Sequence, residues 1–421
     1  MRRSTPACTY DRSACIPFLG LLLLGQQAVA QGTSATGVLV QLFEWSYSDI
    51  ALECETYLAQ AGIVGVQISP PQEAIEDPAW WSRYQPVGFT KLVSRSGDQA
   101  ALLDTVRRCQ AVGVQVIADV VANHMAAPPA GGTGTGTAGT TFQNRTFADF
   151  APTDFHHWNG STAGNCGVDN FADRVNVQTC DFNGLPDLNT TSSVVQSKLS
   201  QYIGLLHSLG ITAFRLDSAL LMSASDIQGF MGTAEASLVY QEITLPPRCT
   251  IAPQEYLING KIVLQDYAYS MFTAFKSGQL QGLQAQPYAS DKLIVNIDSH
   301  DLQRQSPLTS LTYTDGKLYE LANIFMLAYP YGQPLLMSSY SFSAFNQGPP
   351  SVPVHGADGS LSCGTDQPWV CEHRTPSYKV MINFRNHTSQ ALVTDWQILM
   401  GGAMVAFSRG SGFVAINTAG I

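Results

Sequence analysis

Short apolar runs alternate along the chain with stretches in which apolar residues recur every three to four positions. The runs predict buried β-strands, and the recurring positions predict amphipathic helices. Strands are expected at residues 38–43, 65–68, 115–121, 213–216, 238–240, 261–264, 293–297 and 334–337. Helices are expected between them, for example at residues 49–61, 99–111 and 193–209.

This alternation of strand and helix implies a parallel sheet, and eight strands favour a closed (β/α)8 TIM barrel. A doubly wound sheet is the alternative, but no GxGxxG turn follows the first strand. Residues 123–188 are rich in Gly, Thr, Asn and Asp and include GGTGTGTAGTT at 131–141. This connection is too long for an ordinary loop, so it predicts an inserted subdomain or a large functional loop.

The two ends of the chain differ from this pattern. After about Tyr340 the helical periodicity fades, and short alternating runs at 403–407 and 412–416 predict a small β-domain. At the N-terminus, two arginines precede a short apolar run and the small residues Ala28-Val29-Ala30. This arrangement predicts a signal peptide at residues 1–30, cleaved before Gln31. A membrane anchor is the alternative, but the run is about half of the ~20 residues that span a bilayer.

Composition agrees with an extracellular enzyme that acts on neutral polar ligands. The net charge is -10 and charged residues are 13% of the chain, which argues against a nucleic-acid surface. Nothing in the sequence demands more than a monomer. Asn144, Asn159, Asn189 and Asn386 stand in N-glycosylation sequons.

The cysteines suit an oxidising compartment. Cys8 and Cys15 leave with the signal peptide, and seven cysteines remain. Cys166 with Cys180, and Cys363 with Cys371, are close in sequence and easily paired. Seven is odd, so at least one thiol is left over. No CxxC spacing supports a thiolate metal site.

Polar and charged residues lie at or just after the ends of several of the predicted strands. Active sites of parallel barrels lie at the carboxyl ends of the strands, where these side chains would meet. Any one of them could be a solvated loop residue, but so many strand ends together predict a site. The residues are Asp119, Asn123, His124, Arg215, Asp217, Glu242, His300 and Asp301.

Three acids in one pocket suit glycoside hydrolysis. One carboxylate attacks the anomeric carbon, and one carboxylic acid protonates the leaving oxygen. Arg215, two residues from Asp217, would keep that carboxylate ionised. The segment PAWWSRYQP adds Trp80, Trp81, Tyr84 and Gln85, which could stack on and hydrogen-bond a sugar ring. Core packing is the alternative for the two tryptophans.

Together these residues resemble the animal-type branch of the α-amylases of glycoside hydrolase family thirteen. The resemblance rests on motifs in order from about Val38 to about Thr418: LFEWSYSDIALECETYLAQAGIVGVQISPP, WWSRYQPV, DVVANHM, GLPDLN, FRLDSA, YQEI, SHD, YPYG…MSSY and WVCEHR. It implies a TIM barrel with an inserted B domain after the third strand and a C-terminal antiparallel β domain. The expected divisions are residues 31–122 and 189–345 for the barrel, 123–188 for the B domain and 346–421 for the C-terminal domain. That last domain is shorter than the family's standard, so it is either minimal or incomplete.

The resemblance also implies a role for each site residue. Asp217 would be the nucleophile, Glu242 the general acid/base, and Asp301 the acid that holds substrate hydroxyls. Arg215 would be the partner of the nucleophile. The residues expected to contact sugar are Trp80, Trp81, Tyr84, Gln85, Asp119, His124 and His300. The implied activity is endo-hydrolysis of α-1,4 bonds in starch, glycogen and maltooligosaccharides by a retaining mechanism.

A structural calcium between barrel and B domain is part of the same resemblance. Asn123 and Asp187 match its side-chain ligands, and Gln178 and Leu221 stand where backbone carbonyls complete the site. Oxygen ligands of this kind suit calcium. The resemblance further pairs Cys54 with Cys109 and supports the other two pairs, which leaves Cys249 as the free thiol.

Two departures from the family's pattern change the expectations. Ser299 and Leu335 replace an asparagine and a basic residue that bind an activating chloride, so no chloride dependence is expected. Leu220 and Leu221 replace a Lys-His pair on the leaving-group side of the substrate. The second change leaves two alternatives open, an α-glucan transferase on the same fold and a weakly active or inactive glucan-binding relative.

Overall fold

The computed structural model describes residues 37–157, 166–232, 235–284, 288–305, 309–364 and 366–420. The expected signal peptide and the sequon at Asn159 lie outside these residues. Within the described part of the chain, no helix combines the length and the apolar character that a membrane crossing requires.

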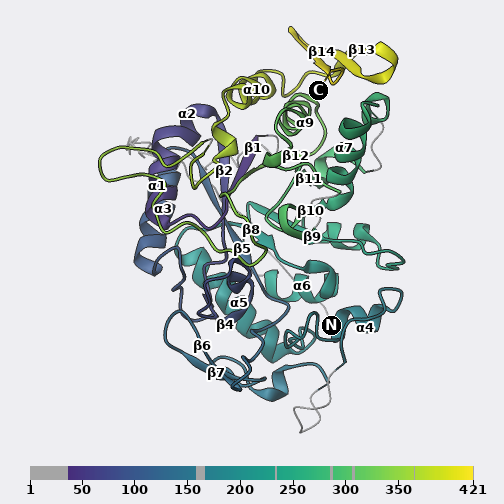
Figure 1. The fold of residues 1–421 in the computed structure, drawn as a ribbon. Coiled ribbons are helices and arrows are strands. Elements are labelled where there is room, and N and C mark those ends of the chain that lie inside the picture. The colour runs from purple at the N-terminus through teal and green to yellow at the C-terminus, as the bar shows by residue number, and fades with distance from the viewer. Residues whose placement is uncertain are drawn as a thin grey trace, which may run out of the picture. The chain divides into compact units, whose positions relative to one another are not determined.

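Eight parallel strands close into a barrel, as predicted (Figure 1). Their order around the ring is β1-β12-β11-β10-β9-β8-β5-β2. The strands are β1 (Val38–Leu42), β2 (Ile63–Ile68), β5 (Gln115–Val120), β8 (Ala213–Leu216), β9 (Leu238–Ile243), β10 (Lys261–Leu264), β11 (Leu293–Val295) and β12 (Gln333–Ser338). Each matches an expected strand to within a few residues.

Helices connect the strands and bury one face against them. The helical elements that cover the barrel include α1 (Tyr47–Glu53), η1 (Cys54–Leu58), α2 (Ala59–Ala61), α3 (Gln99–Ala111), α5 (Ser193–Ser208), α6 (Ala224–Met231), α7 (Gln265–Ser277) and α9 (Lys317–Ala328). Side-chain caps start several of them, because a short polar side chain satisfies backbone N–H groups of the first turn. Asp98 accepts from the backbone N–H of Ala101 at the start of α3, and Ser192 accepts from that of Val194 at the start of α5.

Three disulfides confirm the expected pairing. Cys54–Cys109 joins η1 to α3, Cys166–Cys180 lies in the insert, and Cys363–Cys371 follows the last barrel strand. Among the described cysteines, Cys249 is free.

The long connection between β5 and β8 carries its own small elements. These are the hairpin β6 (Thr133–Thr135) and β7 (Thr141–Gln143), the turn η3 (Pro152–Asp154) and the helix α4 (Arg174–Thr179). The hairpin region is held by Glu73 on β3 (Glu73–Ala74), which pairs with β4 (Pro86–Gly88). Glu73 Oε1 accepts from the backbone N–H groups of Ala138 and Thr140 at 3.0 and 3.1 Å. A Cβ at Gly136 would lie 2.5 Å from that same oxygen, which accounts for a glycine in this polar run.

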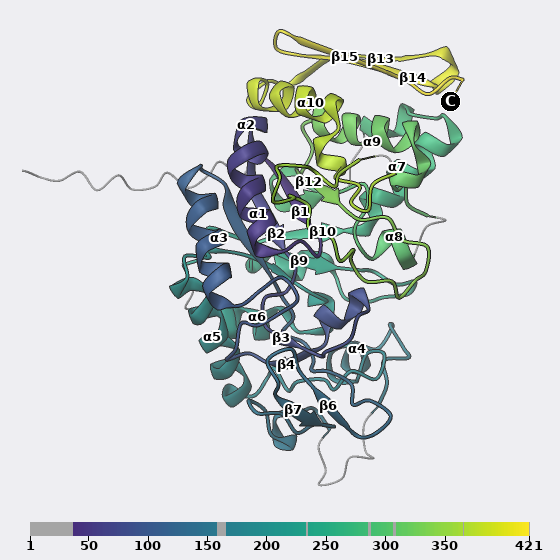
Figure 2. The same cartoon turned by 60° about the vertical axis from the view of Figure 1, so that its left-hand side comes forward.

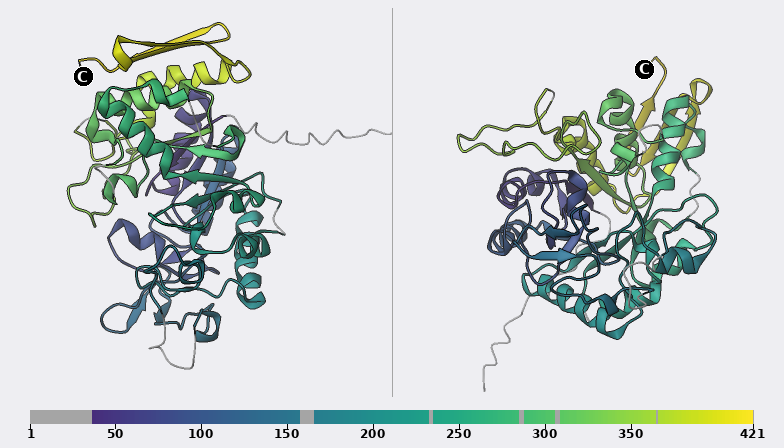
Figure 3. Two further views of the ribbon diagram at one scale, coloured as in Figure 1. Left: turned by 90° about the vertical axis from the view of Figure 1, so that its right-hand side faces the viewer. Right: turned by 60° about the horizontal axis from the view of Figure 1, so that its bottom comes forward.

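A three-stranded antiparallel sheet ends the described chain. It consists of β13 (Val393–Leu399), β14 (Met404–Arg409) and β15 (Gly412–Asn417), in that order. Figure 2 and the left view of Figure 3 show it beyond helix α10 (Pro376–His387), which packs beside α9.

Helix α10 corrects the expectation that helical structure ends near Tyr340. The sequence pattern does not show this helix clearly, because one of its three buried residues is charged. These residues are Tyr378, Ile382 and Arg385. The Arg385 guanidinium donates to the carbonyl oxygens of Met326 and Tyr329, at the end of α9 and just after it. A buried arginine of this kind is satisfied by backbone that is distant in sequence, so the apolar pattern does not show that the last turn of the helix is buried.

Candidate active site

The carboxyl ends of neighbouring strands bring the predicted acids together. Asp119 on β5 lies directly opposite Arg215 on β8, and Glu242 is on the next strand, β9. Asp217 follows β8, and its backbone N–H donates to the carbonyl of Val120 on β5 at 2.9 Å. Because the strands are parallel and adjacent, their ends place four charged side chains at one edge of the barrel.

Arg215 is the centre of this group. Its Nη1 lies 2.7 Å from Asp119 Oδ1 and 2.7 Å from Asp217 Oδ1, and its Nη2 lies 2.8 Å from Glu242 Oε2. The surrounding carboxylates raise the pKa of Arg215 well above its ordinary range even though burial opposes them, so the guanidinium stays charged. Glu242 is oriented further by the backbone N–H of Ser218 at 3.0 Å and by the Thr244 hydroxyl at 3.3 Å.

Two other carboxyl groups of the site hold protons more tightly than usual. Burial raises the pKa of Asp119 to about 7, because Arg215 only partly offsets the loss of water and the charge of Asp217 adds to it. Burial and the charges of Glu242 and Asp217 raise the pKa of Asp301 to about 8. Crowded carboxylates in a site of low dielectric favour the neutral form of some members.

His300 lies in a stack of rings beside Asp301. Its ring is 4.9 Å from that of Tyr84 and 4.8 Å from that of Phe43, nearly parallel to both. Burial and the neighbouring arginines lower the pKa of His300 well below its ordinary value, so the imidazole is neutral. Gln41 Nε2 lies 3.2 Å from His300 Nδ1, and His300 Nε2 lies 3.4 Å from Asp301 Oδ2. The face of Tyr84 is thereby fixed, and its hydroxyl donates to Asp119 at 3.0 Å.

The predicted aromatic segment forms the short helix η2 (Trp80–Tyr84) at the rim of the same site. His124 Nε2 lies 2.9 Å from the Tyr84 carbonyl, and burial lowers the pKa of His124. The Gln85 side chain accepts from the backbone N–H of Ala127 at 3.1 Å, which ties the segment to the insert.

A cavity of about 370 Å³ lies over these groups, with walls from both the barrel and the insert. Asp119 and Arg215 lie beneath it rather than in its lining. The predicted residues that line it are Trp80, Trp81, Tyr84, Gln85, His124, Asp217, Leu221, Glu242, His300 and Asp301. The lining residues that sequence reasoning did not select as sites are Phe171, Phe182, Asn183, Leu185, Ser218, Leu220, Thr244, Pro246, Gln265 and Phe345.

Some of these additional lining residues could have been found from the sequence, and others could not. Ser218 and Thr244 each lie within two positions of a predicted acid, so proximity in sequence points to them. Phe182 and Leu185 come from the insert, and no local pattern in the sequence says that the insert faces the strand ends. Phe345 is an aromatic residue in a segment rich in Ser, Gly and Pro, which marks a loop but not its partner.

The residues expected to bind calcium form two pairs. Asn123 and Asp187 are brought together by the backbone, where the N–H of Leu188 donates to the Asn123 carbonyl at 2.9 Å. Gln178 on α4 donates to the carbonyl of Met222, next to Leu221 on η4 (Ala219–Leu221). Asp187 is 2% exposed, and burial raises its pKa to about 7 although His156 Nδ1 lies 2.6 Å from Oδ2. A buried carboxylate with so little compensating charge, next to an amide, fits a hard cation such as calcium.

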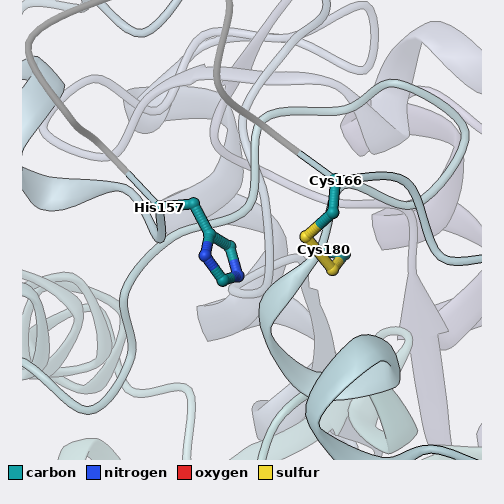
Figure 4. A group of neighbouring side chains, drawn as sticks. All are labelled: His157, Cys166 and Cys180. Carbon is teal, nitrogen blue, oxygen red and sulfur yellow. A yellow bond between two sulfur atoms is a disulfide. The ribbon is translucent and has the colours of Figure 1, made fainter.

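A second group of metal-ligating residue types does not form a metal centre. His157, Cys166 and Cys180 have their ligand atoms within 4.8 Å of one another (Figure 4). The two sulfur atoms are bonded to each other, however, so neither offers the thiolate that binds a metal. The His157 ring instead lies 2.9 Å from the Thr179 hydroxyl.

A closed barrel with a carboxylate cluster at its strand ends and an aromatic cleft above defines a barrel enzyme, and comparison with known proteins identifies the class. Residues 53–252 match the family model described as "Alpha amylase, catalytic domain". The α-amylase of Tribolium castaneum is 36% identical over 95% of this chain and 85% of its own length. That of Aeromonas hydrophila is 37% identical over 93% of this chain and 87% of its own length.

A solved structure agrees with these relatives. The wild-type α-amylase I of Eisenia fetida superposes with a TM-score of 0.82 at 29% identity, over 91% of this chain and 84% of the other. The chain belongs to the α-amylase family. It is a glycoside hydrolase, as the sequence predicted.

Proposed function

We propose that this protein is a secreted, endo-acting, retaining α-amylase that hydrolyses internal α-1,4-glucosidic bonds of starch, glycogen and maltooligosaccharides. One observation carries the proposal: a single guanidinium holds both Asp217 and Glu242 at the floor of an aromatic cleft. Two carboxylates that bind the two ends of one guanidinium must lie close together, as the roughly 5–5.5 Å separation in retaining glycosidases requires.

The chemistry proceeds in two displacements. The Asp217 carboxylate attacks the anomeric carbon while Glu242 gives its proton to the leaving oxygen, which breaks the glycosidic bond and forms a glycosyl ester. Glu242, now a carboxylate, takes a proton from water as the water attacks the same carbon and releases Asp217. Arg215 contacts both carboxylates and so holds the two side chains in position relative to each other.

The other groups bind and orient the sugar. Tyr84 offers an aromatic face that is fixed by the His300 ring, and Trp80 and Trp81 extend that surface. Asp301 is neutral below a pH of about 8 in the free protein, so it can donate a hydrogen bond to a substrate hydroxyl. His124 and His300 line the cleft as further hydrogen-bonding groups. The contacts expected of Asp119 and Gln85 with sugar stay predictions.

Endo action is supported by the extent of the cleft. Besides Asp217 and Glu242, its lining includes Trp81 and Phe345 as well as Thr244 and Gln265, which come from several different strand-end connections. A glucan chain that extends both ways from the cleaved bond fits such a cleft. The α-amylase I of Eisenia fetida was also solved as a variant in complex with maltohexaose.

We propose a structural calcium held by the side chains of Asn123 and Asp187 and the carbonyls of Gln178 and Leu221. When bound, calcium supplies the positive charge that buried Asp187 lacks. The four residues join the segment after β5 and the end of η4 to the insert, so the ion would fix residues 123–188 onto the barrel. We also propose residues 31–122 and 189–345 as the barrel and 346–421 as the C-terminal β domain.

Secretion is proposed from the signal peptide at residues 1–30 and is supported by the three disulfides. N-glycans are proposed at Asn144, Asn159, Asn189 and Asn386, and the enzyme is proposed to act as a monomer. Independence from chloride is proposed because Ser299 and Leu335 stand where the family has an amide and a basic ligand for the ion. The two terminal nitrogens of Arg215 already bind carboxylates.

A second candidate is α-glucan transfer on the same site. The wall that follows Ser218 is apolar, with Leu220 and Leu221 in the lining of the cleft that holds Glu242. Such a wall favours a bound acceptor sugar over free water at the second displacement. Sizing the products of maltoheptaose separates the two reactions, because a transferase also makes chains longer than its substrate.

The first experiment is starch hydrolysis by the secreted protein, followed by loss of iodine staining and release of reducing ends. Rapid loss of staining with few reducing ends supports endo action. A folded protein that leaves starch unchanged would overturn the proposal and favour a glucan-binding relative.

A further inference from the structure

Phe345 is a largely exposed aromatic side chain on the wall of the cleft. It lies in the connection between β12 and η9 (Glu372–Arg374), and it lines the same cleft as the catalytic carboxylates. Phe345 is 52% exposed, whereas neighbouring Trp80 is 3% exposed. A single apolar residue exposed elsewhere on a protein surface is common. A large aromatic residue exposed on the wall of a binding cleft more often contacts a ligand.

The turn that carries Phe345 is built onto the aromatic helix η2. The indole N–H of Trp80 donates to the Phe345 carbonyl at 2.8 Å, and that of Trp81 donates to Asn346 Oδ1 at 3.0 Å. A Cβ at Gly348 would lie 1.9 Å from the carbonyl oxygen of Pro78, so only glycine permits this close approach. The position of Phe345 is therefore fixed before any ligand binds.

A buried arginine supports the turn from below. The Arg304 guanidinium lies 4.1 Å from the centre of the Phe342 ring and 5.1 Å from that of Trp80. Its Nη1 donates to the His300 carbonyl at 2.9 Å. Arg304 thus joins the Phe345 turn to the strand end that carries Asp301, and it does so through cation–π contacts and one hydrogen bond.

A series of rings leads from the catalytic carboxylates to Phe345. Tyr84 stacks on His300, Trp80 meets Tyr84 edge-on at 6.3 Å, and Phe345 meets Trp80 edge-on at 6.0 Å. Thr244, in contrast, is bonded to Glu242, the group that protonates the leaving oxygen. Phe345 is therefore connected to the group around Asp301 through the rings of Trp80, Tyr84 and His300.

We propose that Phe345, together with Trp81, forms an outer glucosyl-binding platform on the wall of the cleft formed by η2 and the Phe345 turn. It would bind a sugar ring some units away from the cleaved bond and so select longer α-glucans over short ones. This platform rests on the proposed function. A rigid aromatic face binds a sugar's apolar C–H surface with little loss of side-chain entropy, because its position is already fixed.

The test compares Phe345→Ala with the wild type on maltoheptaose and maltotriose. For maltoheptaose, kcat/KM is expected to fall about tenfold, mostly through KM, because uniform binding is lost. For maltotriose, which cannot reach the platform while bound across Glu242, kcat/KM is expected to stay within about twofold. Phe345→Tyr keeps the ring and is expected to restore the preference for the long substrate.

Phe413→Ala is the matched control. Phe413 is 66% exposed and lies on β15, in the C-terminal sheet rather than the cleft. Phe413→Ala should leave kcat/KM unchanged for both substrates. Equal loss on both substrates in Phe345→Ala, or no loss on maltoheptaose, would overturn the platform.

A binding measurement separates this proposal from the proposed function. In a Glu242→Gln background, calorimetry with maltoheptaose is expected to show about tenfold weaker binding after Phe345→Ala. Weaker binding would support the platform even if the wild type proved to be a poor hydrolase. Unchanged affinity would overturn the platform even if hydrolysis of starch were confirmed.

Discussion

The Nη2 atom of Arg215 lies 2.8 Å from Oε2 of Glu242, although the two side chains come from different strands and are 27 residues apart. The same guanidinium contacts Asp217 and Asp119. One buried cation therefore compensates three carboxylates. This arrangement makes Arg215 a structural requirement of the site as well as a partner of the proposed nucleophile.

Arg215→Met is expected to destabilise the protein by about 3–5 kcal/mol, because it leaves buried carboxylates without a counter-charge. Thermal unfolding would measure the loss, and starch hydrolysis should fall with it. Arg174→Met is the control, since Arg174 forms an ion pair with Glu255 at the surface. A Tm as high as that of the control would contradict the central role of Arg215.

Glu242→Gln is expected to lower kcat on starch by about 10²–10⁴-fold, the usual contribution of general acid–base catalysis. The amide keeps the shape of the side chain but cannot give or take the proton. Release of reducing ends measures the rate, and circular dichroism checks the fold. Glu255→Gln makes the same change in a surface ion pair and should retain full activity.

Asp301→Asn is expected to stabilise the free protein relative to the wild type, and more so as pH rises. The pKa of Asp301 is about 8 in the folded state and ordinarily 3.8, so the folded state binds the proton more tightly than the unfolded state. Between pH 4 and pH 8 the stability of the wild type therefore falls as that preference is lost. The Asp301→Asn variant has no titrating group at this position, so its stability does not fall in this way.

The difference in Tm between Asp301→Asn and wild type should grow from pH 4 to pH 8, by at least about 2 °C, and then level off. Asp291→Asn, at an exposed site, should show no such growth. A difference that does not vary with pH would mean that Asp301 titrates normally. Activity should fall in Asp301→Asn at every pH.

Removal of calcium with EDTA is expected to lower Tm, and added calcium should restore it, because the ion binds the folded state only. Asp187→Asn should abolish this calcium-dependent shift, whereas Asp169→Asn, at an exposed position of the insert, should preserve it. Differential scanning calorimetry measures the shift, with and without calcium at about 1 mM, which is roughly the level that extracellular sites require. If the Tm of the wild type did not change with calcium, the proposed site would be excluded.

Replacing chloride by acetate in the assay is expected to leave starch hydrolysis unchanged. Arg215 binds carboxylates through both terminal nitrogens, and the Ser299 hydroxyl is engaged locally, where it accepts the backbone N–H of Leu302 at 3.2 Å. A rate that rises with chloride at constant ionic strength would contradict this expectation.

The barrel itself could be predicted from the sequence. Each strand is a local run of apolar residues, and the closed ring follows from their number and their alternation with helices. The strand-end acids were predicted as well, because a charged residue at the end of a buried strand contributes little to packing and is costly to bury without a partner. Helix α10 was missed, since buried Arg385 interrupts its apolar face and is satisfied by carbonyl groups from α9 and the turn beyond it.

The sequence by itself predicted which groups would do the chemistry: Asp217, Glu242, Asp301 and the arginine two residues before the first of them. Only the tertiary structure decided how they share charge. Asp119 and Asp301 hold raised pKa values because burial and neighbouring carboxylates act on them across strands. Phe345 became a candidate platform because distant indole groups fix its turn on the cleft wall. Electrostatics and packing depend on distances in space, and a linear pattern does not contain them.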